Sequence, residues 1–77
     1  MVLWTRMDVR TYAAEVVTGN GSRYWLSLEH LSARDWDWTV WHHSRPWMCH
    51  YGVVPGGPQP GFAAAEQAVR SLMQMAG

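Results

Sequence analysis

Three histidines and the single cysteine of this 77-residue chain fall within nine positions, and their side chains can bind a metal or take part in catalysis. They are His42, His43, Cys49 and His50. Zinc needs four such ligands that converge as a tetrahedron. In the alternating pattern around them, His43 and His50 are predicted on one side of a strand, and His42 and Cys49 on the other. At most two can therefore converge, so a small metal-binding protein remains only an alternative function.

Catalysis needs a reactive group and a partner that activates it. Cys49 beside a histidine would be a nucleophile pair, but Cys49 is predicted on the buried side of a strand, where a thiol is usually inert. Asp35 and Asp37 share one side of a strand, and we interpret them as a solvated edge that discourages sheet aggregation. No glycine loop has the spacing of a phosphate-binding loop before a helix. We expect neither an enzyme nor a bound cofactor.

The sequence from residue 36 to residue 54 predicts a β-hairpin. Aromatic and β-branched residues alternate with polar ones on both sides of a break at residues 44–46, which is typical of half-buried strands. A two-residue turn at Ser44-Arg45 makes every inward pair apolar. The predicted pairs are Val40 with Cys49, Trp38 with Tyr51 and Trp36 with Val53.

An earlier hairpin is predicted around the loop at residues 19–21, because glycine and asparagine tolerate positive φ. A three-residue loop places apolar residues opposite one another, and a two-residue loop would mix the two faces. The predicted pairs are Val16 with Tyr24, Ala14 with Leu26 and Tyr12 with Leu28. Residues 30–35 are predicted as the connection to the next strand.

The C-terminal part predicts one helix over residues 62–76, after a Pro/Gly segment at residues 55–61 that cannot continue a sheet. Its apolar stripe has helical spacing and consists of Phe62, Ala65, Val69, Leu72, Met73 and Ala76. Packing this stripe on an antiparallel sheet over residues 11–54 gives a single α+β domain. The predicted fold is a two-layer β-β-β-β-α sandwich, with residues 1–9 as an arm or a fifth, edge strand.

Composition limits the cellular compartment and the classes of partner that we expect for this protein. One cysteine excludes an internal disulfide, and the N-terminus lacks the apolar run of a signal peptide. No apolar segment reaches the roughly 20 residues that span a bilayer, so we expect a cytoplasmic protein without membrane contact. Six basic and six acidic residues give a formal net charge of zero, which disfavours nucleic acid as the main partner.

The sheet face away from the helix is predicted to carry large apolar side chains, and such patches usually mark contact sites. We expect a non-catalytic module that binds a partner protein, either an unidentified one or a second copy. Chains of this size without catalytic residues are often accessory or inhibitor proteins of phages and mobile elements, such as anti-CRISPR inhibitors of a host defence complex. The alternatives are single-stranded nucleic-acid binding on the same face, or coverage of this face by Leu3 and Trp4. The predicted partner-binding residues are Trp25, Trp41, Met48, Arg23, His43 and His50.

Overall fold

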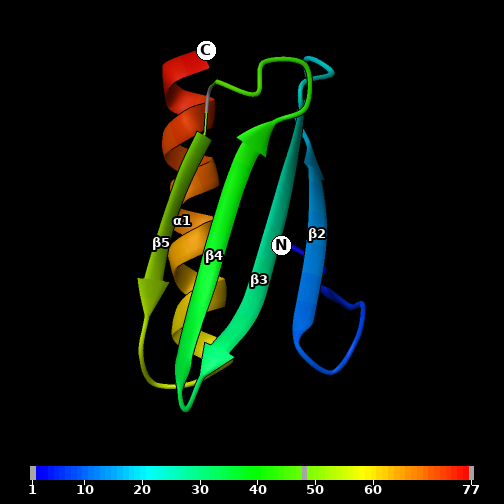
Figure 1. The fold of residues 1–77 in the computed structure, drawn as a ribbon. Helices are drawn as coiled ribbons and strands as arrows, with labels where there is room; N and C mark the ends of the chain where they lie inside the picture. Colours follow the sequence, from blue (N-terminus) through cyan, green and yellow to red (C-terminus); the bar gives the residue numbers. More distant parts are fainter. Residues whose placement is uncertain (1, 48, 77) are drawn as a thin grey trace.

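The computed structural model describes residues 2–47 and 49–76, and it contains a five-stranded antiparallel sheet with one helix packed on one face (Figure 1). The strands follow chain order across the sheet, and the helix follows the last strand. This confirms the predicted fold class, with the N-terminal segment supplying a short edge strand. The elements are β1 (Thr5–Arg6), β2 (Thr11–Val17), β3 (Arg23–Ser32), β4 (Asp35–His42), β5 (Cys49–Val54) and α1 (Pro58–Ala76).

The hairpin of β2 and β3 has the predicted register. Val16 lies opposite Tyr24, Ala14 opposite Leu26 and Tyr12 opposite Leu28. Thr18 and Ser22 close the loop, since the Thr18 N–H donates to the Ser22 carbonyl over 2.9 Å. The apolar pairing and the loop chemistry select the same register, so the two faces cannot exchange.

Strands β3 and β4 are longer than predicted, because residues 30–32 belong to β3 and only Ala33 and Arg34 form the turn. Ala33 has a φ of 47°, in the left-handed region that two-residue hairpin turns require. Alanine rarely adopts this φ, which explains why no turn could be predicted at this position.

The hairpin of β4 and β5 differs from the prediction by one residue. Val40 lies opposite His50, Trp38 opposite Gly52, and Trp36 opposite Val54. A Cβ atom added at Gly52 would lie 3.0 Å from the Trp38 indole, so the ring packs directly over the glycine. A tyrosine in that place, as predicted, would collide with the ring. The hairpin was predicted correctly, but its predicted register was wrong.

This shift turns three side chains of β5 to the other face of the sheet. Cys49, Tyr51 and Val53 were predicted to face the helix, and all three are exposed on the opposite face. Trp47, also predicted inward, lies in the connection before β5 and is exposed as well. A one-residue slip has this effect because side chains alternate along a strand.

Helix α1 begins at Pro58, four residues earlier than predicted, since proline is well suited to the first turn of a helix. Gly61 then brings the helix close to β3: a Cβ atom there would lie 2.4 Å from Leu28 Cδ1. The helix contacts β3, β4 and β5. Within the described residues, no helix is long and apolar enough to cross a membrane.

The core lies between α1 and the sheet. It contains most of the predicted helix stripe and the inward side chains of β2, β3 and β4. The side chain of Ala76, the last predicted stripe position, is outside the described part. The buried core residues are Ala14, Tyr24, Leu26, Val40, Ala65, Ala68, Val69 and Leu72.

The N-terminal segment extends this core and leaves most of the opposite face uncovered. The Trp4 ring lies 4.8 Å from that of Phe62, and its Nε1–H donates to Glu66 Oε2 over 3.0 Å. Trp4 therefore packs on the helix side, and the alternative in which Leu3 and Trp4 together cover the other face is wrong. Leu3 stays exposed at the β1 edge.

Candidate functional site

The sheet face away from α1, here called the open face, is formed by the odd-numbered positions of the four longer strands. Antiparallel pairing aligns these positions in rows across the sheet, so residues distant in sequence become neighbours. Its members are Thr11, Ala13, Glu15, Val17, Arg23, Trp25, Ser27, Glu29, Asp37, Thr39, Trp41, Cys49, Tyr51 and Val53.

Aromatic and apolar side chains occupy the centre of the open face. Trp25 and Trp41 are directly paired across β3 and β4, with ring centroids 6.3 Å apart and planes tilted by 51°. Both are half-buried, because each shields part of the other. On β5, Tyr51 lies opposite Thr39, one row from the pair, and is 76% exposed. Val53 lies opposite Asp37, one row further along, and is 58% exposed. Burying such side chains against another surface would be favourable.

Charges of opposite sign flank this apolar centre. At one end, Arg23 lies beside His43, whose N–H donates to the Arg23 carbonyl over 2.8 Å. Toward the other end, Glu29 lies directly opposite Asp37 on the neighbouring strand. Two carboxylates in a direct cross-strand pair repel each other, so the pair is costly to the fold unless a positive group approaches it.

A shallow hollow of about 240 Å³ adjoins the aromatic pair at the β1 edge. Its lining is mostly apolar, with Leu3, Met7, Ala13, Ala14 and Trp25, and also includes Thr5 and Glu15. The hollow is large enough for one apolar side chain of a partner. The open face therefore offers both a flat aromatic area and a recess beside it.

The structure brings together four of the six predicted partner-binding residues. Trp25, Trp41 and Arg23 lie on the open face, with His43 at its end. His50 does not join them, because the register of β5 turns it toward the helix, and this prediction was wrong. Met48 lies outside the described residues.

Sequence reasoning missed Tyr51 and Val53, the most exposed large apolar side chains of the open face among the described residues. The signal that could have found them is Gly52. A glycine inside a strand often marks a close approach of another group, and here that group is the Trp38 ring.

The four histidine and cysteine side chains do not converge. His42 and His43 are consecutive in the chain and point to opposite faces, as do Cys49 and His50. Cys49 is exposed instead of buried, contrary to the prediction. Among the described residues, no three His, Cys, Asp or Glu side chains are placed to hold a metal ion.

Comparisons with protein-family models, with curated proteins and with solved structures found no match to this chain. The functional argument therefore rests on the geometry of the chain itself.

Proposed function

We propose that this protein is a non-catalytic binding module that docks its open face onto a partner protein. The observation that supports this most is the exposure of Tyr51, one row from the Trp25–Trp41 pair, together with that of Val53 on the same strand. Tryptophan and tyrosine are the side chains that most often anchor protein interfaces. A small domain gains nothing for its own stability from apolar side chains that face solvent.

The charges of the open face define the partner's surface. A complementary surface has an apolar centre, acidic groups opposite Arg23, and basic groups opposite Glu15 and the Glu29–Asp37 pair. A second copy of the open face, turned end for end by a two-fold axis, presents this same order. The first measurement is therefore the mass of the protein in solution by light scattering across a concentration series.

The test compares Tyr51→Ser with Val9→Ser. Both parent side chains are apolar and similarly exposed, at 76% and 78%, but Val9 lies in the β1–β2 connection, away from the open face. We expect Tyr51→Ser to weaken partner capture or dimerisation by about tenfold or more, as for a central interface anchor. Val9→Ser should leave binding unchanged.

The outcome is judged on a purified partner identified by capture from native lysate, or on the dimer if light scattering detects one. Circular dichroism confirms that both variants remain folded. Equal binding by the wild type and Tyr51→Ser would show that the open face is not the binding surface.

Single-stranded nucleic acid is the second candidate, because the Trp25–Trp41 pair lies one row from Arg23. Bases could stack on the indole rings while the guanidinium contacts a phosphate. Glu15, in the same row as Trp25, and the Glu29–Asp37 pair would repel the rest of the backbone. Nucleic-acid binding would fall steeply with salt, and binding through the apolar centre would change little.

An inhibitor of a host defence complex is one form that this protein-binding function could take. The argument for it rests on chain length and the absence of catalytic motifs in the sequence. Identification of the captured partner tests it directly: a subunit of a defence nuclease would support it, and a partner without a role in defence would contradict it.

A further inference from the structure

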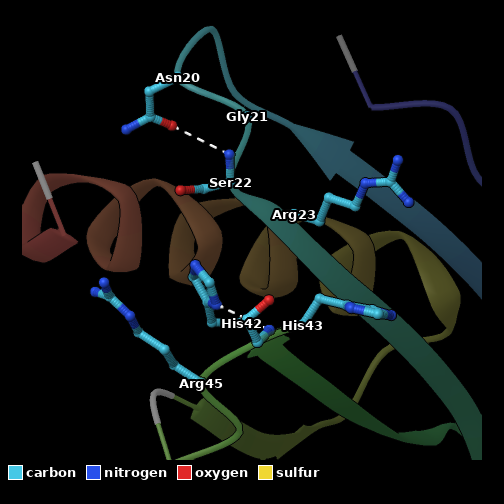
Figure 2. A pocket seen from close by; sticks show the side chains of 8 residues that line it. Asn20, Gly21, Ser22, Arg23, His42, His43 and Arg45 are labelled. Atoms are coloured by element: carbon cyan, nitrogen blue, oxygen red, sulfur yellow. Dashed lines mark hydrogen bonds between the residues drawn. The ribbon is translucent and has the colours of Figure 1, made fainter.

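A second candidate site lies at the end of the sheet, where the β2–β3 loop meets the chain that follows β4. It is a shallow cavity of about 470 Å³, widely open to solvent, and Figure 2 shows the side chains around it. The lining residues are Asn20, Gly21, Ser22, Arg23, His42, His43, Ser44 and Arg45. Two of them, Arg23 and His43, also belong to the open face or its end. The other six lie outside it, so the cavity borders the proposed docking surface and shares these two residues with it.

The cavity is lined by basic side chains and by no acidic ones. Two of the six arginines of the chain line it, and none of the six acidic residues does. Within the described residues, the arginine side chains that form hydrogen bonds are those of Arg6, Arg34 and Arg70. The guanidinium groups of Arg23 and Arg45 are thus available to a ligand.

Hydrogen bonds within the loops already use two side-chain acceptors of the cavity. The Ser22 N–H donates to Asn20 Oδ1 over 3.1 Å, and the Thr18 hydroxyl also contacts this oxygen. The Ser44 N–H donates to His42 Nδ1 over 3.1 Å. Two kinds of hydrogen-bond donor remain on these side chains: the amide N–H groups of Asn20 and, in the neutral His42 ring, the N–H at Nε2.

Neighbouring side chains fix the position of the His42 ring, and with it the position of the Nε2–H. It is only 6% exposed, and its ring packs edge-on against Tyr24, with centroids 5.0 Å apart. Among the described residues, no fully buried side-chain nitrogen lacks a hydrogen-bond partner, so the His42 Nε2 atom, which has none, is not fully buried. Figure 2 shows the His42 ring between Ser22 and Arg45, while Arg23 and His43 point to the other side.

We propose that this cavity binds a phosphate group, held by Arg45, the His42 Nε2–H, the Asn20 amide and the Ser22 hydroxyl. A site with a guanidinium and several neutral donors and without carboxylates suits a compact oxyanion, because charge-assisted hydrogen bonds are the strong ones. Arg23, on the far side, adds long-range attraction. The volume leaves room for a small molecule attached to the phosphate.

The test uses inorganic phosphate and adenosine monophosphate as separate probes. Amide chemical shifts in ¹⁵N-labelled protein are followed during each titration, with sodium chloride at matched ionic strength as the reference. We expect saturable shifts at residues 20–23 and 42–45 with both probes. Equal affinities would assign the site to the phosphate alone, and tighter nucleotide binding would assign it to a phosphorylated small molecule. Shifts that sodium chloride reproduces would overturn the proposal.

Two matched arginine variants test whether phosphate binds in the cavity. Arg45→Gln should weaken phosphate binding by about tenfold or more, the effect of losing a charged hydrogen-bond donor. Arg10→Gln removes the same charge in the β1–β2 connection and should leave the affinity unchanged. Both arginines are exposed, so both variants should fold, and equal affinities for the two would overturn the proposal.

Discussion

The two faces of the sheet use the same residue types for opposite purposes. On the covered face, Tyr24, Leu26 and Val40 are at most 1% exposed because α1 packs on them. On the open face, the Trp25–Trp41 pair is half-buried, and Tyr51 is largely exposed. Apolar area that the fold buries stabilises the fold, and apolar area that it leaves in water is available to a partner. The open face is therefore the surface that we propose for contact with a partner.

The largest difference between the faces should appear on removal of an aliphatic side chain from each. Leu26→Ala on the covered face should lower the free energy of unfolding by about 2–5 kcal/mol, because it leaves a cavity. Val53→Ala on the open face should change it by less than about 0.5 kcal/mol. Urea unfolding of both variants measures the difference. Similar losses would show that the open face is covered in solution.

A smaller effect should follow from an added methyl group where the helix meets the covered face. Gly61→Ala places a Cβ 2.4 Å from Leu28 Cδ1, and Leu28 is fully buried. We expect a loss of about 1–3 kcal/mol from overpacking, partly offset by the better helix propensity of alanine.

Thermal and urea unfolding measure the effect of Gly61→Ala. Leu28→Val in the same chain is the control, since it frees volume at the contact and should recover part of the loss. A stabilised Gly61→Ala variant would contradict the close approach of α1 to β3.

On the open face, the interaction between Trp25 and Trp41 should be measurable by a double-mutant cycle. We expect Trp25→Ala and Trp41→Ala to be coupled by about 0.5–1.5 kcal/mol, the usual range for an aromatic pair. Urea unfolding of the two single variants and the double variant gives the coupling. Strictly additive losses would mean that the rings do not touch in solution.

The smallest effect should come from Asp8, which belongs to neither face. The Arg10 backbone N–H, 2.8 Å from Asp8 Oδ1, holds the pKa of this carboxyl below its usual value of 3.8. A lowered pKa in the folded state adds stability above pH 3.8, and that stability is lost as the pH falls through the folded pKa.

Asp8→Asn should therefore be slightly less stable than the wild type near neutral pH, and the gap should close in acid. Thermal unfolding of both proteins across an acid series measures it. A gap that widens toward low pH would contradict this assignment.

The candidate site could be predicted only in part from sequence. Trp25, Trp41 and Arg23 were found because they lie on or beside the first hairpin, where alternation and loop chemistry agree. Tyr51 and Val53 were missed and His50 was misplaced because all three depend on the register of β5. The end-of-sheet cavity was not predicted, since it joins two loops that lie about twenty residues apart.

The fold class, the first hairpin and the apolar stripe of the helix could all be predicted from the sequence alone. Each of these follows from local patterns: side chains alternate along a strand, and they repeat every three to four residues on a helix. Such patterns need no knowledge of distant neighbours.

The face that each side chain of β5 occupies and the close approach of α1 to β3 are visible only in the folded structure. Both depend on contacts between distant residues: the Trp38 ring over Gly52, and Leu28 against Gly61. In each case a large side chain needs a partner without a Cβ atom. Steric exclusion of this kind acts across elements, so alternation along one strand cannot reveal it.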